Sequence, residues 1–410
     1  MSFKSMKKKD VVLFYGPLAT ERTYKERGLI TWCAPCSNRM RRLGQSLRVS
    51  GCRCFIISPA ISLRVPAKRW CHYPVIEHLN GVPIVSLGQF GAKYLGFLLS
   101  PLTACLALRK IMCRHRVTAI MQYVYYPDAL LISLVGKMLY GCRIILDLED
   151  VCVPCWADWK LNSGVRPVQQ LIGSLLMKAS LLIADVIIVP TSKFMPYTKR
   201  QISDILLVKG CQPVADCLPE ATYKEGRAIK ILFGGAFVFE HGIHLLAEAL
   251  CMLKENSLEC PIEVHTCGSG NKVDWFVNAV KDVKNIPIHC HGYLSNREFC
   301  CLFESIDVCC VLQNPQGRYG TLKTPSKGYE ALCSGKTIIV SDIGDFQELP
   351  DDICYHLHIY TAEGLKDIIT SLTLQDVITK RESALHYAKK HWDSSIVGAQ
   401  ILQKGIAQHA

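Results

Sequence analysis

The sequence predicts an α/β protein with two doubly wound domains. Short β-branched runs alternate with stretches of helical period along most of the chain, and this alternation starts again near Ala228. The chain has 410 residues, of which 50% are hydrophobic, so it is long enough and apolar enough to form two packed cores. We therefore expect two mainly parallel sheets, each covered by helices on both faces.

The first half of the chain predicts a β-loop-α-β beginning followed by further strands and helices. Apolar runs predict strands at residues 11–15, 52–58, 82–87, 118–122 and 143–148. A long polar loop is expected over residues 16–36, and a helix is expected to begin at Ser37 and end at Gly51. A second helix is expected over residues 128–140, with Gly141 at its end.

The second half repeats the alternation with a different set of turns. Strands are predicted at residues 229–233, 261–266, 307–312 and 337–340. Gly234 and Gly235 predict a tight turn in which the backbone can approach a phosphate. Helices are expected over residues 242–250 and from Glu298, and residues 362–410 have a mostly helical pattern.

The most informative stretch is the predicted helix that follows Thr324. Thr324 is suited to cap it, Pro325 to its first turn and Gly335 to its end. Lys327 and Glu330 are three residues apart, so they project from one helix face beside the unpaired N–H groups of the first turn, where an anion is favoured. A lysine there suits a diphosphate, and a carboxylate one turn on suits a ribose diol. A surface salt bridge on an ordinary helix would give the same two letters.

The run from residue 323 to residue 340 resembles the P-S/L-K-x-x-E-x-x-A-x-G-x-P-V-I signature of GT-B glycosyltransferases, most closely the retaining family-four group. Residues 184–192 resemble the A-D-x-V-I-x-x-S strand that closes the first domain in that family. The resemblance implies two Rossmann-like domains that face a cleft, with a C-terminal helix crossing back. The implied parts are an acceptor-binding domain at 1–205, a linker at 206–227, a nucleotide-sugar-binding domain at 228–385 and a helical tail at 386–410 that packs on the first domain.

The same resemblance implies a set of donor-binding residues. These are Gly234, Gly235, His241, Gly268, Gly270, Thr324, Ser326, Lys327 and Glu330. Three positions depart from the family pattern: His241 replaces a lysine, Gly235 an arginine, and Leu322 the first of two glutamates. The neutralisation of a diphosphate would therefore depend on Lys327 and on helix N-termini.

Two acidic residues are the candidates for catalysis. Glu149 and Asp150 follow a predicted strand, at the end where open α/β sheets bind ligands. Residues 147–150 resemble the family's D-x-H-D loop facing the sugar, with Glu149 in the position of the histidine. An acidic loop that only caps a backbone segment or is solvated is the alternative.

The charge is unevenly distributed between the two halves. Residues 1–205 contain 28 Lys and Arg against 11 Asp and Glu, whereas residues 206–410 contain 19 against 24. The basic clusters lie at residues 7–9, 39–42, 68–69, 109–110 and 114–116. They predict contact with an anionic membrane. A solvated basic face is the alternative, and nucleic acid is not expected because no zinc-finger, homeodomain-like or RNP pattern occurs.

The 22 cysteines are expected to be free thiols in the cytosol, because the apolar run after the basic start is too short for a secretory signal. Two C-x-x-C pairs, Cys33 with Cys36 and Cys152 with Cys155, leave a four-thiolate zinc site as an alternative. The apolar stretches at residues 94–108 and 171–190 are interrupted by proline or charges and are not expected to span a membrane.

Together these features predict a glycosyltransferase at the cytoplasmic face of the cell membrane. The resemblance implies that it moves a sugar from a nucleotide-diphosphate sugar to a glycan or lipid-linked acceptor with retention of configuration. No metal and no cofactor are expected, because the helix dipole and Lys327 can neutralise the diphosphate. Two alternatives remain: a non-catalytic partner of a glycosyltransferase, suggested by the departures from the family pattern, and a nucleotide-sugar 2-epimerase.

Overall fold

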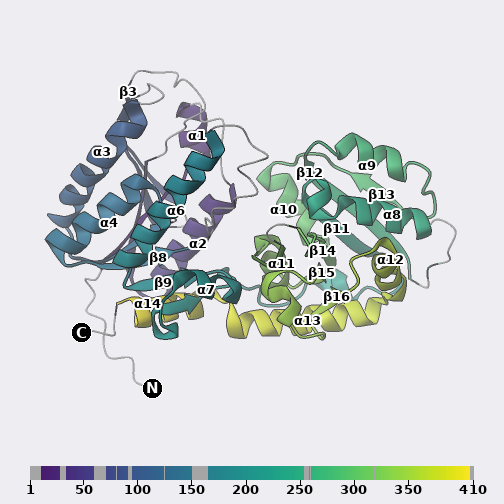
Figure 1. Ribbon diagram of the computed structural model, residues 1–410. Helices are drawn as coiled ribbons and strands as arrows, with labels where there is room; N and C mark the ends of the chain where they lie inside the picture. Colours follow the sequence, from purple (N-terminus) through teal and green to yellow (C-terminus); the bar gives the residue numbers. More distant parts are fainter. Residues whose placement is uncertain are drawn as a thin grey trace. The chain divides into compact units, whose positions relative to one another are not determined.

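The computed structural model divides the chain into two compact units (Figure 1). Unit 1 contains Met1–Pro190, Phe194–Cys211 and Ser394–Ala410, and unit 2 contains Thr191–Lys193 and Gln212–Asp393. The structure describes residues 11–27, 34–59, 71–79, 81–90, 95–123, 125–149, 165–253, 258, 260–317, 320–322 and 324–406.

Unit 1 is built on an eight-stranded sheet with the order β10-β9-β8-β7-β1-β2-β5-β4. The strands are β1 (Val11–Tyr15), β2 (Arg53–Ser58), β4 (Val75–Leu79), β5 (Val82–Ser86), β7 (Val117–Tyr123), β8 (Arg143–Asp147), β9 (Val186–Val189) and β10 (Ile205–Leu207). All neighbours pair in parallel except β4, which is antiparallel to β5. Two short strands, β3 (Cys71–His72) and β6 (Gln89–Phe90), form a separate antiparallel pair.

The helices of unit 1 include one from the C-terminal end of the chain. They are α1 (Glu21–Arg27), α2 (Ala34–Val49), α3 (Leu95–Met112), α4 (Pro127–Tyr140), α6 (Val165–Ile183), α7 (Met195–Thr198) and α14 (Ser394–Gly405). Helix α14 packs closely on α2, because Gly398 has no side chain: a Cβ there would lie 2.1 Å from the Ser46 carbonyl oxygen. The expected loop over residues 16–36 is interrupted by α1, so that prediction was wrong for its middle.

Unit 2 is built on a six-stranded parallel sheet with the order β13-β12-β11-β14-β15-β16. The strands are β11 (Ile229–Ala236), β12 (Ile262–Ser269), β13 (Ile288–Cys290), β14 (Val308–Val311), β15 (Thr337–Ser341) and β16 (Cys354–Leu357). The order grows outward from β11 in one direction and from β14 in the other, as in a Rossmann fold. The topological switch point of this sheet therefore lies between β11 and β14.

Helices cover both faces of the second sheet. They are α8 (Ile243–Leu253), α9 (Val273–Val280), α10 (Asn296–Glu304), α11 (Ser326–Cys333), α12 (Ala362–Ser371) and α13 (Leu374–His391). One apolar core contains α8, α9 and α12 residues, and a second contains α11 and α13 residues with α10 packed against it. The predicted fold class, two doubly wound parallel-sheet domains, is confirmed.

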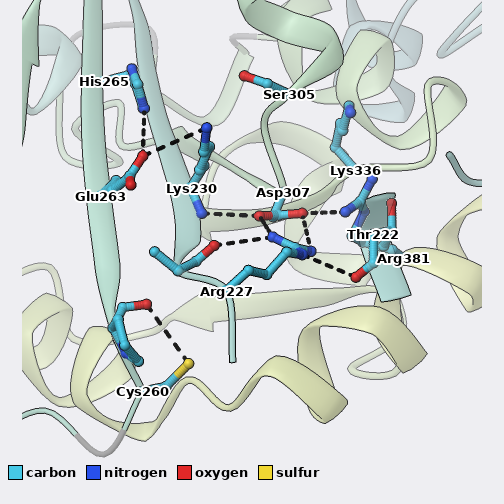
Figure 2. A network of polar contacts seen from close by, with 12 residues as sticks. Thr222, Arg227, Lys230, Cys260, Glu263, His265, Ser305, Asp307, Lys336 and Arg381 are labelled. Carbon is cyan, nitrogen blue, oxygen red and sulfur yellow. Dashed lines mark hydrogen bonds and ion pairs between the residues drawn. The ribbon is translucent and has the colours of Figure 1, made fainter. Parts of the chain in front are cut away.

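A buried carboxylate ties the start of β14 to the segments around it (Figure 2). Asp307 is 2% exposed and accepts hydrogen bonds from the Arg227 guanidinium at 2.6 and 2.8 Å. It also accepts from the backbone N–H of Lys230 at 3.0 Å and from the buried Arg381 guanidinium. Arg381 in turn donates to the Gly335 carbonyl oxygen at 2.8 Å. Because Arg381 and Asp307 are both buried and lie on different elements, their ion pair joins α13 to the start of β14.

No helix in the part of the chain that the structure describes is both long enough and apolar enough to cross a membrane.

Candidate functional site

The candidate site lies at the switch point of unit 2, where the carboxyl ends of β11 and β14 diverge. Ligands of open α/β sheets bind outside this edge, because the connections to the two strands leave in opposite directions. Gly234 and Gly235 are near the end of β11, and helix α11 begins at Ser326, between β14 and β15. We call the group Gly234, Gly235, His241, Gly268, Gly270, Thr324, Ser326, Lys327 and Glu330 the switch-point site.

Lys327 connects α11 to the end of β11. Its Nζ atom donates a hydrogen bond of 2.7 Å to the Gly234 carbonyl oxygen. A Cβ on Gly235 would lie 3.0 Å from the same Nζ, so a side chain there would crowd the lysine. Neighbouring atoms desolvate the ammonium and lower the pKa of Lys327, although part of the side chain stays exposed. The structure thus holds a positive charge at the switch point, beside the start of a helix.

The start of α11 leaves polar groups available for a ligand. The N-cap position is Pro325, and no side chain caps the helix. The expectation that Thr324 caps it was therefore wrong, because Pro325 occupies the cap position. The Thr324 hydroxyl oxygen is instead buried and has no hydrogen-bond partner. Ser326, the first helical residue, is exposed. A helix start without a side-chain acceptor is a natural anion site, since its N–H groups point outward.

Glu330 lies one helical turn beyond Lys327 on α11. Its side chain is half-buried, and its charge opposes the lowering of the Lys327 pKa. The two side chains therefore interact electrostatically, as expected for residues three apart on one helix face. At the far end of α11, Gly335 has a φ of 64° and donates its N–H to the Leu332 carbonyl oxygen, which ends the helix as expected.

The glycines of the site allow two strand ends to approach closely. Gly234 and Gly235 do not form the expected turn: they continue β11, in register with Cys267 and Gly268 of β12. Parallel pairing thus continues past Phe233, and the close approach requires glycine at position 268. A Cβ on Gly268 would lie 1.8 Å from the Gly235 carbonyl oxygen. Gly270, with a φ of 156°, would likewise place a Cβ 2.4 Å from the Phe237 carbonyl oxygen.

His241 lies on a short 3-10 helix, Phe239–His241, that follows β11. This segment is tied to the exit of β14, since the Asn314 N–H donates to the Glu240 carbonyl oxygen at 3.0 Å. Gly242, with a φ of 80°, makes the approach possible: a Cβ there would lie 2.0 Å from the Leu312 carbonyl oxygen. His241 is therefore held near the switch point and is partly exposed.

The candidate catalytic loop belongs to unit 1. Glu149 follows β8 and is half-buried, and Asp150 lies outside the described residues. The fully buried Asp147 accepts hydrogen bonds from the Arg39 guanidinium at distances between 2.7 and 3.1 Å. Burial by itself would lower the pKa of Arg39, but the charges of Asp147 and Glu149 raise it. Sequence reasoning placed Arg39 in a basic surface cluster and missed this pair, because 108 residues separate the partners.

The proposed thiolate zinc site falls mostly outside the described residues. Cys33, Cys152 and Cys155 are among those not described, and Cys36 is half-buried. The described cysteines do not form disulfides.

No protein-family model matches the chain, and no curated protein matches it in sequence. Several solved structures are similar to it in fold. A glycosyltransferase from Rickettsia africae ESF-5 is 15% identical, with a TM-score of 0.61 over 98% of this chain and 100% of that chain. WaaG, a glycosyltransferase involved in lipopolysaccharide biosynthesis, is 11% identical, with a TM-score of 0.58 over 96% and 99%. The catalytic domain of starch synthase IV from Arabidopsis thaliana, bound to ADP and acarbose, is 10% identical, with a TM-score of 0.56 over 95% and 99%.

The fold of this chain is therefore that of the GT-B glycosyltransferases. Structural likeness runs nearly from end to end, and both units take part. The resemblance inferred from residues 323–340 is confirmed at the level of fold.

Proposed function

We propose that this protein is a glycosyltransferase that uses a nucleotide-diphosphate sugar as donor. The observation that carries the proposal is the position of Lys327: its ammonium lies at the switch point, against the Gly234 carbonyl and beside an uncapped helix start. A diphosphate matches this arrangement, since it would accept from the lysine, from the helix N–H groups and from the unpartnered Thr324 hydroxyl. Glu330, one turn on, would accept hydrogen bonds from ribose hydroxyls.

In the proposed reaction, the protein positions the two substrates and stabilises charge. The bond between the sugar and the diphosphate breaks, and the acceptor oxygen attacks on the same face, so the configuration is retained. The departing diphosphate helps to take the proton of the acceptor hydroxyl, while Glu149 and Asp150 stabilise the cationic sugar. Lys327 and the start of α11 supply the positive charge that the leaving group needs, so no metal is required for that step. In this assignment residues 228–385 bind the donor and residues 1–205 the acceptor, and 206–227 join them. Of the expected tail at 386–410, the segment Ser394–Ala410 belongs to unit 1, the acceptor unit, and residues 386–393 belong to unit 2.

We further propose that the acceptor is a glycan or a lipid-linked saccharide, at the cytoplasmic face of the membrane. The exposed surface of α3 supports this part: Leu102 is 59% and Leu106 is 58% exposed, and the next exposed residues of the helix include Arg109 and Lys110. Apolar side chains beside a basic helix end suit a surface of anionic lipid. Vesicles containing phosphatidylglycerol should bind the protein at low salt and release it at high salt, and equal binding to neutral vesicles would contradict the electrostatic part.

The donor can be identified by thermal shift. The full chain is heated with UDP, GDP, ADP or CMP and with sugars of each, because a ligand that binds only the native state raises its Tm. We expect one nucleotide class to raise it, followed by transfer of the sugar to an acceptor with retained anomeric configuration. If no nucleotide raises the Tm of well-folded protein, the donor site is wrong.

The departures from the family pattern favour a second candidate, a non-catalytic partner of a glycosyltransferase. Gly235 and Leu322 bring no charge to positions where the family has an arginine and a glutamate, and Glu149 replaces an imidazole. Such a partner would bind a nucleotide sugar without turnover by any acceptor. Release of free nucleotide together with a glycosylated acceptor would exclude it. A product consisting only of an epimerised sugar would instead indicate a 2-epimerase.

A further inference from the structure

A group of imidazoles and a carboxylate lies near one edge of the second sheet, on β12 and the edge strand β13. Glu263 and His265 are two residues apart on β12, so their side chains point to the same face of the sheet. His289 of the edge strand β13 is directly opposite His265 in the parallel register. One ligand atom from each of these three side chains lies within 4.8 Å of the others.

His265 is the buried member of the group and has an unused nitrogen. Its side chain is 9% exposed, and its Nε2 atom has no hydrogen-bond partner. This nitrogen faces the Glu263 carboxylate, with 3.6 Å between Nε2 and Oε2 (Figure 2). A buried polar atom without a partner costs free energy unless something binds it. The nitrogen and the carboxylate therefore offer two ligand atoms to an ion that would lie between them.

The spacing fits a tetrahedral metal ion. Bonds of about 2.0–2.2 Å from zinc to nitrogen and oxygen place neighbouring ligands about 3.3–3.6 Å apart in a tetrahedron. The observed separation of 3.6 Å is close to this value before any side chain moves. His289 is exposed, so a rotation of its ring can bring a nitrogen to the same centre.

His291 supplies the outer hydrogen bond that metal-binding histidines usually have. Its Nε2 lies 3.0 Å from His265 Nδ1, and the two rings are parallel within 4°. When His265 Nδ1 carries the proton and donates to His291, Nε2 of His265 keeps its lone pair for a metal. Outer partners of this kind fix the tautomer and orient the ring.

We propose that Glu263, His265 and His289 form a binding site for one divalent transition-metal ion of the zinc type. The ion would join β13, a strand of three residues at the sheet edge, to its neighbour β12. His265 is three residues before Gly268, or about 10 Å along the strand. The site is thus separate from the switch-point site and does not depend on the proposed function.

Lys230 competes with a metal for the same carboxylate. Its Nζ atom lies 3.6 Å from Glu263 Oε2, and its side chain is 34% exposed (Figure 2). Since the lysine can turn into solvent, it weakens metal binding without blocking it. Lys230→Met should therefore bind the metal more tightly than the natural protein, whereas a merely structural carboxylate would show no such effect.

The test uses Co²⁺ as a spectroscopic substitute for Zn²⁺ on the metal-stripped full chain. Exposed thiols such as Cys290 and Cys300 also bind metals, but a Co²⁺–thiolate bond adds an intense near-ultraviolet charge-transfer band. We expect one equivalent of Co²⁺ to give visible d–d bands without that band, and Zn²⁺ to remove them. Zn²⁺ should also raise the Tm, because it binds the native state.

Variants assign the ligands. His289→Ala and Glu263→Gln should abolish the d–d bands at one equivalent, and His291→Ala should weaken Co²⁺ binding by about 10- to 100-fold. His78→Ala, which removes an exposed histidine of unit 1, should leave binding unchanged. His289 is exposed, so its loss should not unfold the protein. Unchanged Co²⁺ spectra in His289→Ala, a thiolate band, or no d–d bands in the natural protein would each overturn the proposal.

Discussion

Replacing Lys327 by methionine should weaken nucleotide binding much more than it affects folding. The lysine now donates to one neutral acceptor, the Gly234 carbonyl oxygen at 2.7 Å. A bound diphosphate would replace that acceptor by charged oxygens, and a hydrogen bond to a charged group contributes about 1.5–3 kcal/mol against about 1 kcal/mol for a neutral one. The difference of about 0.5–2 kcal/mol corresponds to about a 2- to 30-fold increase in Kd.

The same substitution should change the free energy of unfolding by about 1 kcal/mol or less, because the lost hydrogen bond is exposed. The assay is calorimetric titration of the full chain with the nucleotide diphosphate found by thermal shift. Lys389→Met is the matched control, since Lys389 also donates to a backbone carbonyl of unit 2, that of Asp216 at 2.6 Å. Equal affinities for the Lys327 and Lys389 variants would refute the assignment of the diphosphate site.

Three further predictions concern the stability of unit 2. Asp307→Asn should lower the free energy of unfolding, measured by urea titration, by about 3–5 kcal/mol, because it leaves buried guanidinium groups without their counter-charge. In the control Asp367→Asn, which changes an exposed carboxylate, the free energy of unfolding should change by less than about 1 kcal/mol. Desolvation lowers the pKa of Lys336 to about 8, so between this pH and the higher pKa of the unfolded state the unfolded chain binds one more proton than the folded protein. The natural protein should therefore become more stable relative to Lys336→Met as the pH rises from 8 to about 10. A stability difference that does not change with pH would contradict the burial of the charge. Gly268→Ala should lower both the Tm and the nucleotide affinity, because its Cβ would lie 1.8 Å from the Gly235 carbonyl oxygen. In the control Gly226→Ala the Cβ meets nothing within 4 Å, so only the strain of the positive φ should lower the Tm, and the nucleotide affinity should not change.

Local sequence signals predicted most inner strands of both sheets, but they missed the edge strands β4, β10, β13 and β16. Apolar runs placed the strands to within a few residues, as for residues 337–340 and the observed Thr337–Ser341. Gly141 and Gly335 ended their helices with positive φ, because glycine adopts this conformation without a steric cost. These features depend on neighbours in sequence, which is why they can be predicted from the sequence.

Local signals failed where a distant segment supplies the partner. Two consecutive glycines, Gly234 and Gly235, are typical of a turn, but Gly235 pairs with Gly268 of β12 and the strand continues. Thr324 is a residue type that often caps helices, but the N-cap position of α11 is occupied by Pro325. Arg39 belongs to a basic cluster that was predicted to lie on the surface, but its guanidinium pairs with the buried Asp147 at the end of β8.

The sequence by itself determined that the chain alternates strands and helices in two series, and that a lysine and a glutamate lie on one face at a helix start. Both properties follow from period and spacing within a few residues. Only the tertiary structure decided which backbone that lysine contacts and which histidines meet. His265 and His289 are 24 positions apart, and parallel pairing of β12 with β13 puts them side by side. The register of a sheet is a property of the whole domain, because each strand settles where its buried face packs best.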